Sequence, residues 1–290
     1  MKTSAETAAE SNTRSTKKGS ASMKKRLANI RAMDASNASG MGRWTRGYLI
    51  VTVHLLSTLP ALLLTLIVAP VYFPIVLLSR PVVRYKNWWV RCMELTAYAS
   101  QVILTGLRLK TEPGLDVPKS GHIILVNHVN EFEFMPDRRV INKPFLANQA
   151  LKVSPMIYAA LRLGAGITFD EFDGRDMAAS LGHMQEILKE TSVIVYPEGR
   201  RTFSEEIQDL KTGVLKMAFK QGIPVTPVMK TGMATLRPFA TTLHYFSPGT
   251  VRPEDHADFR GFFDEVKRLM RESKQEHNRK ILGTATGSPE

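Results

Sequence analysis

The chain has 290 residues, a hydrophobic fraction of 43% and a formal net charge of +12 at pH 7. This length allows one large domain or two small ones, and the hydrophobic content is ordinary for a globular core. The one cysteine, Cys92, excludes an internal disulfide, and no Cys/His cluster has the spacing of a zinc site.

Residues 1–47 form a basic arm, with ten Lys and Arg residues against three Asp and Glu residues. The arm therefore carries +7 of the net charge. Residues 1–40 are rich in Ser, Thr, Ala, Asn and Lys without hydrophobic periodicity, which predicts a disordered segment. A basic arm binds nucleic acid or anionic lipid. The apolar segment that follows favours lipid, so we expect no nucleic-acid partner.

Residues 48–80 predict a membrane segment. The 32 residues 48–79 contain no Lys, Arg, Asp or Glu, and about 20 apolar residues suffice for a helix to cross a bilayer. Pro60, Pro70 and Pro74 break or kink a helix. Basic residues flank both ends and prefer the cytoplasmic side. This pattern favours a re-entrant hairpin, with a single tilted span as the main alternative and a buried core helix as a weaker one.

Residues 81–290 alternate helical and strand-like patterns. We expect helices at 83–99, from Ser154 onward, at 174–189 and at 212–221, and strands at 100–110, 122–126, 143–147, 166–169, 192–196 and 223–228. Near the end, six apolar residues share one helical face: Phe259, Phe262, Phe263, Val266, Leu269 and Met270. The alternation predicts an α/β domain with a mixed, partly parallel sheet flanked by helices.

Polar loops follow three of these strands, where ligands of α/β sheets gather. His128 lies just after the strand at 122–126, and Glu133 follows five positions later. A histidine acts as a general base near neutral pH, and a carboxylate on its far ring nitrogen fixes the tautomer. The alternative is an ordinary turn with a surface histidine. No G-x-S-x-G elbow supplies a serine nucleophile, so we expect such a base to activate a substrate hydroxyl directly.

The loop after 192–196 supplies Glu198, Gly199, Arg200 and Arg201, and Lys211 follows further on. Arginine forks match phosphate oxygens. The alternative interpretation is a solvated charged loop. It is less attractive because the loop follows a fully apolar strand.

Four blocks in chain order carry a family resemblance: NHVNEFE (127–133), GAGITFDE (164–171), YPEGRRT (196–202) followed by KTG (211–213), and IPVTPV (223–228). The chain resembles the glycerolipid acyltransferases that acylate lysophosphatidic acid and related lysophospholipids. Each block alone is a weak signal, but all four in order are a strong one.

The resemblance implies an acyltransferase domain over residues 81–290 in which His128 is the base and Glu133 its orienting carboxylate. It implies substrate-binding roles for Asn127, Gly166, Arg175, Glu198, Gly199, Arg200, Arg201 and Lys211. It also implies acyl-CoA as co-substrate, no metal or redox cofactor, and a bilayer partner. We expect the catalytic domain to face the cytoplasm at the endoplasmic reticulum or another endomembrane, with backbone N–H groups near His128 stabilising an oxyanion.

The chain departs from the family pattern at two positions. Glu133 stands where the family has Asp, and Glu171 stands where it has Arg, with Arg175 four residues on as a replacement. These departures keep one alternative open, a catalytically inactive, acyltransferase-like membrane scaffold.

Overall fold

The computed structural model describes residues 88–130, 133–148, 166–170, 174–234 and 239–283, together with six single positions between residues 56 and 78. The basic arm, nearly all of the predicted membrane segment, the helix predicted from Ser154 and Glu171 lie outside the described residues. Within the described part of the chain, no helix combines the length and apolar character needed to cross a membrane.

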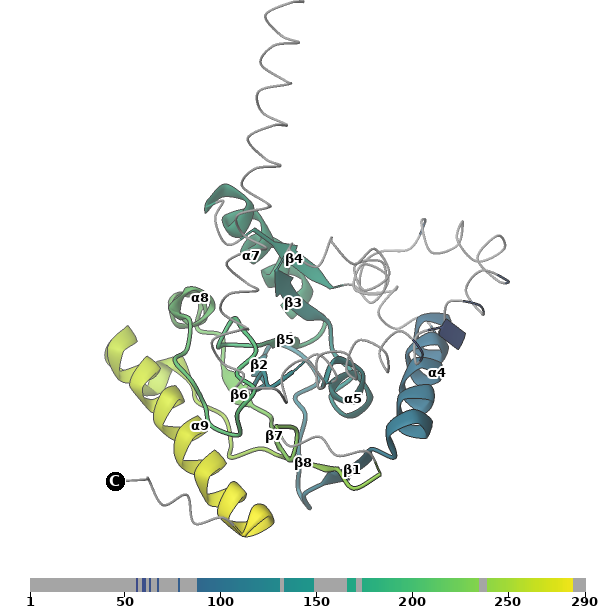
Figure 1. Cartoon of the computed structure of the whole chain (residues 1–290). Coiled ribbons are helices and arrows are strands. Elements are labelled where there is room, and N and C mark those ends of the chain that lie inside the picture. Colours follow the sequence, from purple (N-terminus) through teal and green to yellow (C-terminus); the bar gives the residue numbers. More distant parts are fainter. Residues whose placement is uncertain are drawn as a thin grey trace, which may run out of the picture. The chain divides into compact units, whose positions relative to one another are not determined.

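Five short strands form a wholly parallel sheet in the order β4-β3-β5-β2-β6 (Figure 1). They are β2 (Ile123–Leu125), β3 (Phe145–Asn148), β4 (Ile167–Phe169), β5 (Val193–Val195) and β6 (Val225–Pro227). Because the strands are parallel, the loops that leave β2 and β5 emerge at the same edge of the sheet, and these two strands are direct neighbours.

A second sheet has three strands in the order β1-β8-β7: β1 (Arg108–Thr111), β7 (Met229–Thr231) and β8 (Thr242–Phe246). The β1–β8 pair is parallel and the β7–β8 pair is antiparallel. The predicted α/β class with a mixed, partly parallel sheet is therefore confirmed. The parallel and antiparallel pairs occur together in the three-stranded sheet, whereas the five-stranded sheet is wholly parallel.

The described helices are α4 (Trp88–Thr105), α5 (Phe134–Val140), α7 (Gly174–Leu188), α8 (Thr212–Gln221) and α9 (Phe259–Leu282), with a short 3₁₀ turn at Pro253–Asp255. Local signals fix several ends. The Asp258 side chain accepts the Gly261 N–H and caps α9, and α8 ends at Gly222, which has a left-handed φ of 65°.

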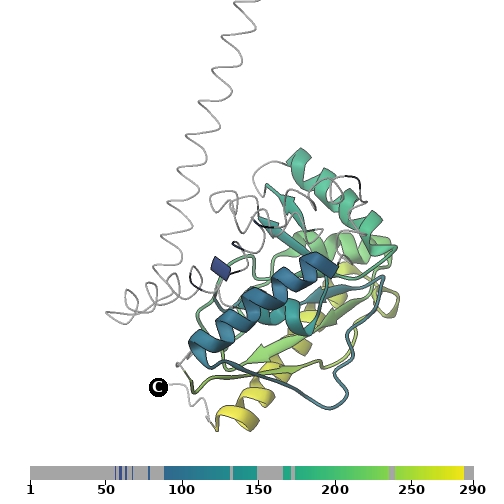
Figure 2. The same ribbon diagram turned by 90° about the vertical axis from the view of Figure 1, so that its right-hand side faces the viewer.

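The prediction of a strand beginning at residue 100 was wrong, because α4 continues to Thr105 (Figure 2). Apolar runs of this length do not distinguish a strand from a packed helix. The hydroxyls of Ser100 and Thr105 donate to the carbonyls four residues earlier, which keeps them compatible with a helix. The helix stops at Gly106, which has a φ of 63°.

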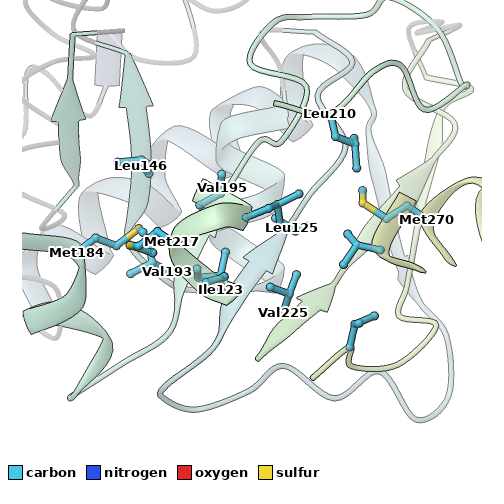
Figure 3. Packing of buried hydrophobic residues seen from close by; sticks show 14 of the residues in the cluster. Ile123, Leu125, Leu146, Met184, Val193, Val195, Leu210, Met217, Val225 and Met270 are labelled. Atoms are coloured by element: carbon cyan, nitrogen blue, oxygen red, sulfur yellow. The ribbon is translucent and has the colours of Figure 1, made fainter. Parts of the chain in front are cut away.

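The core lies on both faces of the parallel sheet because successive strand side chains point to opposite sides. On one face, Ile123 and Leu125 pack with apolar residues of α7, α8 and α9, including Met184, Met217 and Met270 (Figure 3). On the other face, Ile124 packs in a cluster with Leu243 and Tyr245 of β8. The rigid double packing holds the carboxyl edge of the sheet, from which the polar loops leave.

Candidate active site

The loops after β2 and β5 are joined through their backbones at the carboxyl edge of the sheet. The His128 N–H donates to Glu198 Oε2 at 2.6 Å, and the Thr202 N–H donates back to the His128 carbonyl at 2.9 Å. The Phe203 N–H bonds the Val129 carbonyl at 3.0 Å. His128 is therefore held by the loop that carries Glu198, although 70 residues separate the two in the chain.

His128 and Glu133 form the pair suggested by their spacing, with His128 Nδ1 hydrogen-bonded to Glu133 Oε1. The carboxylate also accepts the N–H groups of Val129 and Asn130. Burial raises the pKa of Glu133, but Lys230, His128 and the Val129 amide together outweigh it, so this pKa lies below its usual range. The Glu133 side chain, 1% exposed, is thus an ionised acceptor for the imidazole.

The His128 imidazole is held on its face as well as at its edge. It stacks on the Tyr196 ring with 4.3 Å between ring centroids and 14° between planes. The side chain is 22% exposed. With Nδ1–H donating to Glu133, Nε2 is the nitrogen left to accept a proton, which is the arrangement of an oriented general base.

Behind Glu133 lies a wholly buried ion pair, which the sequence did not predict. Lys230 of β7 donates to Asp137 Oδ2 at 2.7 Å and lies 3.2 Å from Glu133 Oε2. Asp137 of α5 also accepts the hydroxyls of Tyr196 and Tyr245, each at 2.7 Å. The only local signal was a lone lysine in the apolar stretch VTPVMKTGM, which gives no hint of its partners.

Charge compensation decides the state of this lysine. Burial lowers the pKa of Lys230, but Asp137 and Glu133 together outweigh it and raise the pKa above its usual value. Burial raises the pKa of Asp137, and the nearby Glu133 charge adds to this against the effect of Lys230. The two carboxyl groups therefore favour the charged form of the lysine.

Glu198 is a second buried carboxyl beside the imidazole, and within the described part of the chain no Lys or Arg forms a salt bridge with it. Its oxygens accept the N–H groups of His128 and Gln208. Burial raises its pKa to about 7, against the lowering effect of these amides. In this geometry Glu198 fixes the backbone of His128.

Gly199 packs closely against the Lys211 side chain. Gly199 has a φ of 64°, and a Cβ added there would lie 3.1 Å from Lys211 Cγ. The Lys211 N–H donates to the Pro197 carbonyl at 2.7 Å. Arg200 and Arg201 follow, both partly exposed, in the segment that Thr202 attaches to His128. The structure therefore brings Glu198, Gly199, Arg200, Arg201 and Lys211 to the edge that carries His128.

Three expected site residues have other placements. Asn127 is 2% exposed, and its amide exchanges two hydrogen bonds with the Lys230 backbone, at 2.8 and 3.1 Å. Asn127 therefore ties the loop after β2 to β7. Gly166 lies at the amino end of β4, opposite to the His128 edge. Arg175 lies in the first turn of α7, after β4, and three strand spacings, about 14 Å, separate β4 from β2.

Three described backbone amides near His128 bond carboxylates. The backbone N–H of His128 bonds Glu198, and those of Val129 and Asn130 bond Glu133. These amides stabilise the two carboxylates and are not directed at a substrate. Among the described residues, no group of three His, Cys, Asp or Glu side chains is arranged to hold a metal ion.

Residues 109–231 match the model of the Acyltransferase family. This stretch contains His128, Glu133, Glu198 and Lys230. The resemblance drawn from the four blocks is thereby confirmed.

Two proteins similar to this chain carry the name "Probable 1-acyl-sn-glycerol-3-phosphate acyltransferase", from Mycoplasma pneumoniae and Mycoplasma genitalium. They are 27% and 25% identical over 160 residues, which is 52% of this chain and 58% and 57% of theirs. The chain thus matches a little over half the length of these relatives.

The fold is similar to that of a solved structure, the 1-acyl-sn-glycerophosphate (LPA) acyltransferase PlsC from Thermotoga maritima. The TM-score is 0.54 at 21% identity, and the match covers 77% of this chain and 98% of the other. At this identity the likeness supports the fold alone.

Proposed function

We propose that this protein transfers a fatty acyl group from acyl-CoA to the free hydroxyl of a lysophospholipid such as lysophosphatidic acid. The observation that carries the proposal is the bond from His128 Nδ1 to the buried, ionised Glu133, which leaves Nε2 as the base. The names of the relatives support the choice of acceptor class.

The reaction follows from this geometry. His128 Nε2 accepts the proton of the acceptor hydroxyl as the hydroxyl oxygen attacks the thioester carbonyl carbon. Glu133 stabilises the imidazolium that forms. The C–S bond of the tetrahedral intermediate then breaks, the carbonyl re-forms, and the CoA thiolate leaves and takes up the proton from the imidazolium. The products are the ester and free CoA, so the atoms and the proton balance.

The acceptor phosphate is bound by the loop that carries Arg200 and Arg201. Guanidinium groups bind phosphate oxygens through paired, charge-assisted hydrogen bonds. Because Thr202 bonds the His128 carbonyl, this loop and the base keep a fixed separation. A phosphate held there presents the glycerol hydroxyl near the imidazole.

The site works at a lipid surface on the cytoplasmic side of an endomembrane. The supporting features are the +7 charge of residues 1–47 and the charge-free apolar stretch 48–79. Vesicle flotation of the full chain tests this part of the proposal. We expect binding to vesicles with and without anionic lipid, stronger with it, and loss of binding on deletion of residues 48–80.

Acyl transfer is tested with membranes that carry the full chain, a panel of lysophospholipids and labelled acyl-CoA, beside His128→Ala. We expect lysophosphatidic acid to be acylated and the rate to fall by about a thousandfold or more in the variant. Equal rates for the two proteins would refute the mechanism. A parallel arm with acyl carrier protein as the donor identifies the thioester, and no transfer to any acceptor from either donor would favour the scaffold alternative.

A further inference from the structure

The cluster behind the base consists of Glu133, Asp137 and Lys230, whose side chains are 1%, 0% and 0% exposed. Burying an ion pair costs about as much as the pair returns, and replacing it by packed apolar side chains is often neutral or stabilising. Fold stability therefore gives no reason for three charged groups at this place. The contacts of these three groups with His128 give such a reason.

Lys230 contacts both groups that hold the imidazole. Its Nζ lies 3.2 Å from Glu133, which receives the His128 Nδ1–H, and 5.4 Å from the centroid of the Tyr196 ring, on which His128 stacks. The Tyr196 hydroxyl donates in turn to Asp137. A closed circuit of contacts thus runs from the imidazole through Glu133, Lys230, Asp137 and Tyr196 back to the imidazole.

The spacing along α5 explains why both carboxylates meet the same lysine. Glu133 immediately precedes the helix and Asp137 is four residues later, so both lie on one helical face. Two like charges at this spacing repel each other. Lys230, from β7, lies between them, and the extra methylene of Glu133 lets its carboxylate reach both the imidazole and the lysine.

The charges of the cluster balance the proton that His128 takes up. With a neutral imidazole, the two carboxylates and the lysine sum to −1, and with an imidazolium they leave no net charge. Without Asp137, the lysine cancels Glu133 and protonation of His128 creates a net +1. Lys230 therefore orients Glu133 at a cost to the basicity of His128, and Asp137 removes that cost.

The residues that the structure describes around the cluster add few further charges. The groups that face it are the hydroxyls of Tyr196 and Tyr245 on Asp137, Glu198 on the His128 N–H, and Lys274 of α9, which donates to the Lys230 carbonyl at 2.5 Å. Burial raises the pKa of both tyrosines well above the usual value, so they remain neutral donors. Glu198 and Lys274 are the other ionisable groups that have to be followed in a pH titration.

We propose that Lys230 and Asp137 are positioning residues of the acyl transfer, with Lys230 orienting Glu133 on His128 and Asp137 cancelling the lysine charge so that the imidazole keeps its proton affinity. This proposal rests on the proposed function only for its kinetic readout. Its second readout, the titration of the His128 ring, does not require any substrate.

The test uses three variants of the full chain: Asp137→Asn, Lys230→Met and the double variant. Asp137→Asn keeps an acceptor for the tyrosines but leaves the lysine charge uncompensated. In the pH profile of kcat/KM, we expect the acid limb to move to lower pH by about one unit. We also expect a lower maximal kcat/KM at the plateau of this profile. Lys230→Met lowers kcat without this shift, because Asp137 takes up a proton. In the double variant the charge returns to −1, and we expect the limb to return to its wild-type position.

The same shifts are read by NMR from histidine-labelled protein, in which the His128 signal among seven histidines is identified by its loss in His128→Ala. Glu94→Gln is the matched control, because Glu94 is a largely buried carboxylate that pairs with Arg138 of α5 outside the cluster. We expect it to leave the His128 titration unchanged. A wild-type protein that transfers no acyl group, with the NMR shifts as expected, would refute the function and leave the positioning roles standing.

An unshifted titration in Asp137→Asn, or a double variant that titrates like Asp137→Asn, would overturn the proposal. If Asp137→Asn does not fold, Glu133→Asp provides the test, since it keeps the charge but withdraws the carboxylate from Lys230. We expect kcat to fall roughly tenfold or more with little change in KM. An unchanged or higher kcat would show that contact with Lys230 is dispensable.

Discussion

Lys230 and Lys274 are buried to the same extent, 0% and 1% exposed, yet the protein stabilises their charges unequally. Lys230 contacts two carboxylates, and its pKa is raised above the usual value. Lys274 contacts one carboxylate, Glu205, along with the Lys230 carbonyl and the Thr231 hydroxyl, and burial lowers its pKa. The number of compensating charges, not the depth of burial, decides the state of a buried ion.

The two clusters also serve different parts of the site. The Lys230 cluster contacts the base through Glu133. In the Lys274 cluster, Glu205 accepts the N–H groups of Gly232 and Ala234 and the Lys274 ammonium, so it ties the end of the loop with Arg200 and Arg201 to the strand β7 and helix α9. One cluster therefore holds His128, the proposed proton acceptor, and the other holds the loop proposed to bind phosphate.

We expect the largest loss of stability at Lys230, the lysine that contacts two carboxyl groups. Lys230→Met leaves two buried carboxyl groups without their shared cation, which costs about 3–5 kcal/mol of unfolding free energy. Urea denaturation measures the loss. Lys189→Met, at a lysine whose side chain is 68% exposed, is the control and should change stability by less than about 0.5 kcal/mol. A loss as small as that of the control would mean that the cluster is not charged.

Glu198 extends the comparison to a buried carboxyl that forms no salt bridge with a described Lys or Arg. The folded pKa of Glu198 is about 7, above its ordinary value of 4.5, so the folded chain binds this proton more tightly than the unfolded chain. The contribution to stability is full below pH 4.5 and is lost as the pH rises through 7. Between pH 4.5 and 8, wild type should lose roughly 3 kcal/mol relative to Glu198→Gln. Denaturation of both proteins across this range measures it, and parallel curves would contradict it.

A smaller effect is expected at the second lysine. Lys274→Met removes the cation from Glu205, which keeps two amide donors and is 13% exposed. We expect a cost of about 2 kcal/mol. Because the loop with Arg200 and Arg201 is loosened and the base is not, the KM for the acceptor should rise more than kcat falls. The reverse pattern would place Lys274 with the base.

We expect the smallest loss of stability from a change at Gly199, in the loop that carries Arg200 and Arg201. Gly199→Ala puts a side chain at a φ of 64° and within 3.1 Å of Lys211 Cγ, for a cost of about 1–2 kcal/mol. Gly114→Ala is the matched control, since its φ is 83° and no atom lies within 4 Å of the added Cβ. The difference between the two variants in thermal unfolding isolates the contact with Lys211. Equal losses would attribute the whole effect to backbone strain.

Much of the fold was predictable because its signals are local. The apolar runs at 122–126 and 192–196 correspond to β2 and β5, and the patterns at 174–189 and 212–221 correspond to α7 and α8. The error at residues 100–105 came from an apolar run that suits either a strand or a packed helix. The strands β7 and β8 were missed because Lys230 and His244 interrupt the apolar pattern, and both tolerate their positions through tertiary contacts.

The sequence by itself determined the α/β class, the edge of the sheet at which the polar loops emerge, and the pairing of His128 with Glu133, because these depend on hydrophobic periodicity and on residues five positions apart. Only the tertiary structure decided what holds that pair. Lys230 lies 93 residues from Asp137 in the chain, and Asn127 is occupied by the Lys230 backbone. Periodicity indicates that a side chain is buried, but the partner that neutralises a buried charge is fixed by how distant segments pack.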